Sequence, residues 1–290
     1  MPNTYRSIFI SDTHLGSKGC KAKLLNNFLK NNTADNLYLV GDIIDGWRLK
    51  QNWYWPQSHS DVIRRILKIA KRGTQVTYVV GNHDEVLRKW LHFIPVLGNL
   101  TVVNRCDYMG LDGRRYLVIH GDMFDSLMHA SSGRWLMHIG DTLYDFIIKL
   151  NDYWAVLRSK LGLSYWSMSK WIKQNTKQAV SYVLNFEKLL ANYCRSKGYD
   201  GIVCGHIHTA EIRDIDGIIY MNDGSFVEGG SALVETHDGD WIIIEFEGNE
   251  WRPTQVLDRQ TGQILTGEPC VPWFEQKGFS VLQYQDRDSK

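Results

Sequence analysis

The chain has 290 residues, 43% of them hydrophobic, and a formal net charge of +1. This length allows a full hydrophobic core, and the near-neutral charge excludes the overall basic footprint that nucleic-acid-binding proteins usually have. The five cysteines form no Cys-x-x-Cys pair, which argues against a disulfide framework, and without a signal-peptide pattern or an apolar run of about 18 residues we expect a cytoplasmic protein.

The first 120 residues alternate between strand and helix patterns. The predicted strands are Ser7–Ile10, Leu37–Val40, Val76–Val80 and Tyr116–Ile119. Amphipathic helices are predicted at Lys21–Lys30 and Asp61–Lys71 from apolar residues spaced three or four apart. This alternation predicts βαβ crossovers and a largely parallel sheet that helices cover on both faces.

The pattern changes between residues 123 and about 199, where we find no convincing strand. Apolar residues recur every three or four positions over 136–154 and again over 168–190, which predicts two or three inserted amphipathic helices. Basic and aromatic residues alternate along them, as in helices that rest on a lipid surface. Because the insertion begins directly after His120, we favour a lid over a functional site; an extra layer of core is the alternative.

Strand patterns return after residue 200, separated by Asp-Gly turns. The predicted strands are Gly201–Cys204, Ile218–Met221, Ala232–Glu235 and Trp241–Phe246, which indicate a second, mixed or antiparallel sheet. The last forty residues contain three prolines and a polar end. We therefore predict one domain over 1–250, with a helical insertion at about 123–199, and a C-terminal arm or tail over 251–290.

Five short polar signatures each follow an apolar, strand-like run. They are Asp12-Thr-His14, Gly41-Asp42, Gly81-Asn-His-Asp84, His120-Gly-Asp122 and Gly205-His-Ile-His208. Because ligands bind beyond the carboxyl ends of strands in α/β sheets, the signatures should meet at one rim. Seven ligand-type side chains would then converge: Asp12, His14, Asp42, Asn82, His120, His206 and His208.

This donor set is typical of a dinuclear metal centre. Two divalent cations about 3.5–4 Å apart repel each other unless an anion lies between them, and Asp42 is the candidate bridging carboxylate. Carboxylate, amide and imidazole ligands together favour manganese, iron or zinc over calcium or magnesium. We expect two divalent ions, with Mn²⁺ as the first choice.

In this order, the five signatures resemble those of the calcineurin-like metallophosphoesterases. The resemblance implies an α/β fold, a four-layer αββα sandwich of two mixed β-sheets flanked by helices. It also implies two sets of metal ligands that share one carboxylate. One metal would be held by Asp12, His14, Asp42 and His208, and the second by Asp42, Asn82, His120 and His206.

The resemblance further implies a mechanism. His83 would be the acid near the leaving group, oriented by Asp84, while a water activated by the metals attacks phosphorus in line. Within the family, the run from Ser11 to Leu15 and the helical insertion look most like the UDP-2,3-diacylglucosamine pyrophosphatase branch of lipid A synthesis. That branch acts on a membrane-embedded sugar nucleotide, which implies peripheral contact with the inner face of the cytoplasmic membrane through the insertion. Candidate substrate contacts are Trp47, Arg48 and Trp135.

Three functions are compatible with the pattern. The first is hydrolysis of a phosphoanhydride or phosphodiester in a lipid-linked or sugar-nucleotide substrate. The second is a nuclease or broad-specificity phosphodiesterase of the same fold, which should have a basic groove; the net charge counts against it, so no nucleic-acid partner is expected. The third is a non-catalytic scaffold, which should lack ligands, whereas every expected position is filled.

Overall fold

Three parallel strands from the first half of the chain carry the rim at which the signatures were expected to meet. The computed structural model describes residues 2–90, 96–124 and 177–284. In it, β1 (Asn3–Ile10), β2 (Asn32–Val40) and β3 (Gln75–Val79) pair in parallel and in this order. The first two begin before their predicted starts because polar side chains, such as those of Thr4 and Thr33, bond across them.

The larger sheet extends from these strands in both directions, with the order β14-β13-β12-β11-β1-β2-β3-β5-β4. The strands β11, β12 and β13 are antiparallel to their neighbours, whereas β5 is parallel to β3. The remaining strands are β4 (Val96–Leu97), β5 (Leu100–Val103), β11 (Ser231–Glu235), β12 (Trp241–Glu247), β13 (Glu250–Leu257), β14 (Ile264–Thr266) and β15 (Leu282–Gln283), which pairs with β13.

The smaller sheet has the order β6-β7-β8-β10-β9, and its three central strands are parallel. Its strands are β6 (Cys106–Met109), β7 (Arg115–Val118), β8 (Gly201–Cys204), β9 (Glu211–Ile215) and β10 (Ile218–Asn222). Both sheets are therefore mixed, as predicted. The chain after residue 200 builds only part of the second sheet, because β11 and β12 return to the first.

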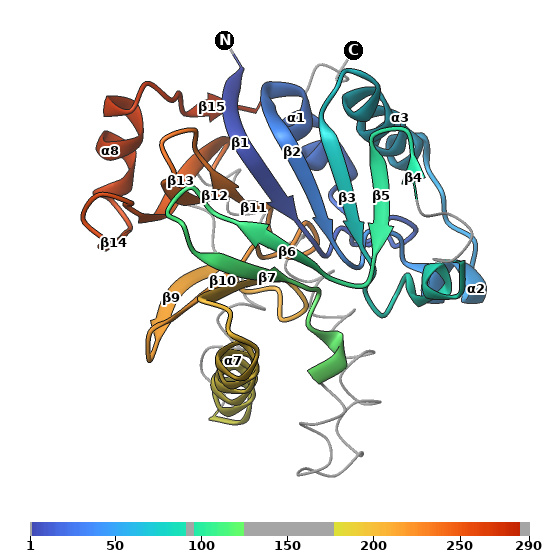
Figure 1. The fold of residues 1–290 in the computed structure, drawn as a ribbon. Coiled ribbons are helices and arrows are strands. Elements are labelled where there is room, and N and C mark those ends of the chain that lie inside the picture. Colours follow the sequence, from blue (N-terminus) through green and yellow to red (C-terminus); the bar gives the residue numbers. More distant parts are fainter. Residues whose placement is uncertain (1, 91–95, 125–176, 285–290) are drawn as a thin grey trace.

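Helices cover the outer face of each sheet (Figure 1). The first sheet packs against α1 (Ala22–Asn31), α3 (Gln57–Lys71) and α8 (Cys270–Gln276). The second packs against α7 (Lys177–Lys197). Between the sheets lies a separate apolar core, which includes Phe9, Val40, Val203 and Met221. The molecule is thus the predicted four-layer αββα sandwich.

Short helical segments lie near the rim. They are α2 (Gly46–Gln51) and the 3-10 helices η1 (Glu85–Trp90) and η2 (Asp122–Phe124). The second helical series predicted in the insertion is confirmed as α7 from residue 177 onward, whereas the first series falls in 125–176, outside the described residues. In the part of the chain that the structure describes, no helix combines the length and the apolar character needed to span a bilayer.

The C-terminal region differs from the expected arm. Residues 250–257 form β13 on the first sheet, and the side chains of Phe274 and Trp251 are buried in the outer core. Pro253 is one of the three prolines on which the expectation of an arm was based, and it lies next to a register shift between β12 and β13. A bulge tolerates a residue without an N–H group, so this proline does not end the strand.

Candidate metal centre

The loops after β1 and β2 run side by side and so bring the first two signatures together. Asp12 donates its backbone N–H to the Gly41 carbonyl at 3.1 Å, and His14 donates to the Asp42 carbonyl at 2.9 Å. These hydrogen bonds continue the parallel pairing of the strands past their ends. Both ligand-type residues of the first loop are therefore fixed against the second.

The backbone at the signatures is unusual. Among the described residues, six non-glycine residues have a positive φ, and five of them are predicted ligands: Asp12, His14, Asp42, His206 and His208. Side chains with a Cβ atom disfavour this left-handed region, so such strain persists only where the surrounding contacts impose it. The concentration of strain at the rim is an independent indication of a functional site.

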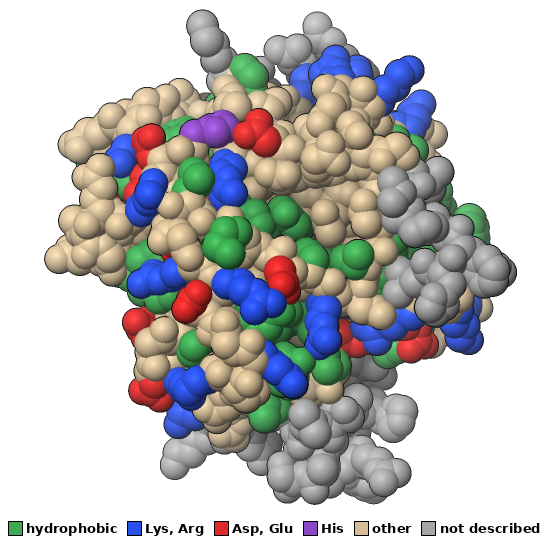
Figure 2. Space-filling view, viewed as in Figure 1, with side chains coloured by type: hydrophobic (Ala, Val, Ile, Leu, Met, Phe, Trp, Pro, Cys, Tyr) green, Lys and Arg blue, Asp and Glu red, His purple; other side chains and the backbone are tan. Residues whose placement is uncertain are grey.

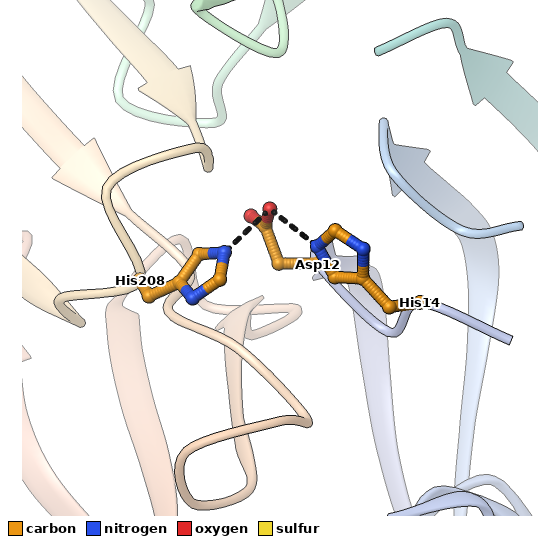
Figure 3. A group of neighbouring side chains, drawn as sticks. All are labelled: Asp12, His14 and His208. Carbon is orange, nitrogen blue, oxygen red and sulfur yellow. Dashed lines mark hydrogen bonds and ion pairs between the residues drawn. The ribbon is translucent and has the colours of Figure 1, made fainter. Parts of the chain in front are cut away.

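Asp12 lies between two imidazoles (Figure 3). Its Oδ1 atom is 3.1 Å from Nε2 of His208 and 3.7 Å from Nε2 of His14. Its Oδ2 atom instead accepts hydrogen bonds from the hydroxyl of Ser11 at 2.6 Å and the backbone N–H of His206 at 2.8 Å. One oxygen therefore holds the loops in place, and the other faces the imidazoles.

Asp42 divides its oxygens in the same way. Its Oδ1 atom accepts the backbone N–H of His83 at 2.8 Å. Its Oδ2 atom lies 3.3 Å from Nε2 of His120 and 3.8 Å from Nε2 of His14. A Cβ atom on Gly81 would come within 2.2 Å of this carboxylate, so only glycine allows the third loop to approach it.

His14, His120 and His208 share one orientation, with Nδ1 toward a protein acceptor and Nε2 toward the carboxylates. Nδ1 of His120 donates to the Val40 carbonyl at 2.9 Å, which requires a proton on Nδ1 and directs Nε2 toward Asp42. In His14, Nδ1 is 3.2 Å from Asp45, and in His208 it is 3.6 Å from Glu228. Metal-bound histidines are held in this way by a second partner.

An observation that is independent of the sequence signatures also indicates that these residues can bind a metal. Nε2 of His14, Nε2 of His120 and Oδ1 of Asn82 are buried without a hydrogen-bond partner. Burial of an unpaired polar atom is costly, so such atoms need an explanation such as an ion. Burial lowers the pKa of His14, but the nearby carboxylates of Asp12, Asp45 and Asp42 outweigh it and raise the pKa to about 10. The same negative field would stabilise cations.

Ligand atoms of three groups of residues lie within 4.8 Å of one another: Asp12, His14 and His208; His14, Asp42 and His83; Asp12, Asp42 and His120. Asp12, His14 and Asp42 each belong to two of these groups. Of the predicted ligands, His206 is in none of the groups that the described residues form. Its ring lies edge-on to that of His120, with the centroids 5.1 Å apart.

His83 lies at the rim, but the prediction that Asp84 orients it is wrong. Nδ1 of His83 is 2.9 Å from Asp45, and Asp84 makes no such contact. The Asp84 carboxylate is buried and instead accepts hydrogen bonds from Tyr78, Gly81 and Ile43. Its neighbouring position in the sequence was misleading because the chain turns between the two residues. Asp84 ties the loops together, and Asp45 orients His83.

The candidate substrate contacts have different outcomes. The Trp47 ring packs on His83 with the centroids 4.3 Å apart, and 41% of the residue is exposed. Arg48 follows it in α2. Trp135 lies outside the described residues.

Two further carboxylates beside the centre were missed or underrated. Glu228 lies beside His208 in a loop after β10, and its sequence context carries no signal for this role. Asp223 is buried and contacts Ser11, which in turn contacts Asp12. Asp223 lies in an Asn-Asp-Gly run, a composition typical of a turn, and the apolar strand before the run is the signal that could have marked it.

Comparison with known proteins agrees with this geometry. A model of the calcineurin-like phosphoesterase family matches residues 5–210. The chain belongs to this family. A UDP-2,3-diacylglucosamine hydrolase from Neisseria meningitidis serogroup B is 27% identical over 81% of this chain and 95% of its own length. The Neisseria gonorrhoeae protein of the same name is 26% identical over 82% and 96%.

A solved structure of Yfce, a phosphoesterase from E. coli, aligns with 90% of this chain and 96% of its own at 14% identity, with a TM-score of 0.38. That overlap is too loose to support the fold assignment, which rests on the strand order and the family match. As a member of this dinuclear-metal family, the protein is a metal-dependent phosphoester hydrolase. The alternative of a non-catalytic scaffold is thereby set aside.

Proposed function

We propose that this phosphoesterase hydrolyses the pyrophosphate bond of a lipid-linked sugar nucleotide of the UDP-2,3-diacylglucosamine type. The phosphoester chemistry rests on the convergence of carboxylate oxygens with imidazole Nε2 atoms, of which those of His14 and His120 are buried and unpaired. The substrate class is supported by relatives of that name whose alignments with this chain span 95% of their length.

The proposed metal ligands follow the sequence assignment. One divalent ion would be held by Asp12, His14, Asp42 and His208, and the other by Asp42, Asn82, His120 and His206. When bound, the two ions supply Lewis acidity and make a water nucleophilic at neutral pH. Mn²⁺ is the proposed metal, with iron or zinc as alternatives, because the donors combine oxygen and imidazole nitrogen.

His83 is the proposed general acid. Its Nδ1–H donates to Asp45 at 2.9 Å, which fixes the orientation of the ring. Nε2 then faces the centre, where it would donate a proton to the departing phosphate oxygen. The side chain is 23% exposed, so a substrate can reach it. Asp45 acts only through the histidines, as a positioning residue.

Trp47 is the proposed contact for the substrate beside His83. Its ring is packed on one side by the imidazole and is exposed elsewhere, so it offers a flat surface next to the leaving group. Arg48 is a candidate for a phosphate contact, since guanidinium groups bind phosphate in a bidentate manner.

The insertion is the proposed lid and membrane contact. It leaves the rim after His120 and returns through α7. A lid at this place would receive the acyl chains. We accordingly propose that the enzyme works at the inner face of the cytoplasmic membrane.

A hydrolysis panel with added Mn²⁺ tests the proposal. It compares UDP-2,3-diacylglucosamine, UDP-glucose, bis(p-nitrophenyl) phosphate and a short single-stranded DNA at equal concentrations. An Asp42→Asn variant prepared in parallel controls for contaminating hydrolases. We expect cleavage of the diacylated sugar nucleotide to exceed that of every water-soluble ester by at least about tenfold, a difference of roughly 1.4 kcal/mol in transition-state binding.

Equal cleavage of all soluble esters would contradict the substrate proposal and favour a broad-specificity phosphodiesterase. Preferential cleavage of DNA would favour the nuclease alternative. On the face drawn in Figure 2, Lys and Arg side chains are scattered among Asp and Glu side chains and form no continuous basic groove. This arrangement does not favour nucleic acid on that face.

A further inference from the structure

Phe186 of α7 is an aromatic side chain at the metal centre that no part of the proposed mechanism uses. It is fully buried, and its ring centroid is 5.8 Å from that of His206, with the ring planes tilted by 37°. The centroid of the His120 ring is 5.1 Å from that of His206. The His206 imidazole therefore lies next to both a second candidate ligand and a side chain of the helical layer.

Gly121 makes this approach possible. It directly follows His120 and has a φ of +117°. A Cβ atom on it would lie 2.9 Å from the tip of the Phe186 ring, at Cζ, and 3.5 Å from Cβ of His206. A residue with a side chain would displace the phenyl ring, so glycine here provides the space that the ring fills next to the imidazole.

The place of Phe186 is set by the helix and not by the loop that it touches. One residue on, Glu187 is buried and pairs with Arg213 of β9 at 2.6 Å. Leu190 and Cys194 continue the same buried face into the core beneath the second sheet. Figure 1 shows α7 lying along the outer side of that sheet. The position of the Phe186 ring therefore depends on how α7 packs against the sheet.

The backbone of His206 is fixed, but its ring is not fixed by the backbone alone. The residue has a φ of +72°, and its N–H donates to Asp12 at 2.8 Å. These restraints leave the side-chain torsions to be selected by neighbouring groups, because staggered rotamers differ little in energy. Close packing against Phe186 and His120 selects among them.

We propose that Phe186 is a positioning residue that holds the His206 imidazole at the angle needed for the second divalent ion. Binding of that ion then depends on how α7 packs on the sheet. This inference rests on the proposed function, since it takes His206 as a ligand. The inference adds Phe186, a residue of the helical layer, as a partner of His206. The ligand signatures in the sequence do not contain this residue.

Mn²⁺ binding to the metal-free full-length protein provides the test, measured by calorimetry together with the thermal midpoint of unfolding. Phe186→Ala should weaken one of the two sites by roughly tenfold, the lower end of the effect of losing a group that orients a ligand. Leu190→Ala is the matched control, because Leu190 is buried one helical turn further on in the same core. It should lower the thermal midpoint and leave both affinities unchanged.

Two further variants separate the possible outcomes. Phe186→Leu keeps an apolar side chain, so its Mn²⁺ affinity should lie between those of the wild type and Phe186→Ala. If the alanine variant does not fold, the test is whether Phe186→Leu binds Mn²⁺ more weakly than the wild type. His206→Ala should lose one site. If it does so while both Phe186 variants bind as wild type, the positioning role is refuted and the proposed centre stands. Equal weakening by Leu190→Ala would also refute the role.

If His206→Ala retains both sites, the ligand assignment itself fails. That result would count against the proposed centre and not only against Phe186. The inference is supported if His206→Ala loses one site and Phe186→Ala weakens one site by roughly tenfold, while Leu190→Ala weakens neither.

Discussion

The two sheets hold their histidines at the candidate centre by different means. His14 and His83, which follow strands of the first sheet, both contact the Asp45 carboxylate. The histidines that follow strands of the second have separate partners: His120 donates to a backbone carbonyl, His206 packs against Phe186, and His208 lies 3.6 Å from Glu228. A carboxylate shared by two rings affects the charge of both, whereas a packed ring contributes to position. We therefore expect the first half to be sensitive to the charge of Asp45, and the second to shape at His206.

Asp42→Asn should have the largest effect because it removes the charge that the two halves share. The variant keeps an oxygen that can accept the His83 N–H, but it loses the negative charge near Nε2 of His120 and of His14. We expect turnover to fall by more than the roughly 10²–10³-fold that loss of a single electrostatic stabiliser costs. Metal analysis should find that bound Mn²⁺ is lost as well. Retention of both ions would show that Asp42 is not the bridge.

His83→Ala tests the acid within the charge-sensitive half. Turnover should fall by roughly 10²–10⁴-fold, the usual contribution of a general acid. Both Mn²⁺ ions should remain bound, since His83 is not among the proposed ligands. The measurement is turnover together with metal content on the same sample. Loss of both quantities in parallel would make His83 a ligand.

Asp45→Asn should act on the first half only. It replaces the carboxylate that contacts Nδ1 of His14 and of His83. Metal affinity or turnover should fall by roughly 10–100-fold. The matched control is Asp122→Asn, whose carboxylate pairs with Arg88 at 2.8 Å. If the control loses as much activity as Asp45→Asn, the contrast between the two halves is wrong.

Per pH unit, the pH dependence of metal binding gives the smallest expected effect. In the metal-free protein the pKa of His14 is raised from 6.5 to about 10, so its proton stabilises the fold below pH 6.5, and this contribution is lost as the pH rises through about 10. Mn²⁺ needs the unprotonated nitrogen, so its affinity should rise between these limits by up to about tenfold per pH unit for each proton displaced.

Thermal unfolding at pH 6.5, 7.5 and 8.5, with and without Mn²⁺, checks this expectation. The shift caused by the metal should grow with pH in the wild type. Asp45→Asn removes one of the hydrogen bonds that raise the His14 pKa, so its dependence should level off at lower pH than in the wild type. A shift that is independent of pH would mean that the ring is already neutral in the metal-free protein.

The fold was largely predictable because its buried strands are short apolar runs. Gly201–Cys204 was predicted with its observed bounds, since all four of its residues are buried. β9 was missed because three of the five residues in its sequence, Glu-Ile-Arg-Asp-Ile, are charged and because it lies at a sheet edge. The strand containing Pro253 was missed because a register shift is a property of the pair and not of either strand.

The centre was predictable to the level of residues but not of partners. Ligand candidates such as Asp12 and His14 lie directly after strands, and strand ends converge whatever the intervening chain does. Orienting partners come from wherever the loops bring them. Asp45 lies three residues after Asp42 and has no feature in the sequence that distinguishes it from a helix-capping or turn residue, and Glu228 and Phe186 are brought in only by tertiary packing.

The left-handed backbone at five candidate ligands has a consequence for engineering. Strain of this kind costs on the order of 1–3 kcal/mol per residue, and glycine would relieve much of it. Replacing His206 or His208 by glycine would thus be expected to raise the free energy of unfolding of the metal-free chain while removing a ligand. A screen that rewards heat resistance alone would drift toward inert proteins at these positions, so any such screen must be coupled to turnover.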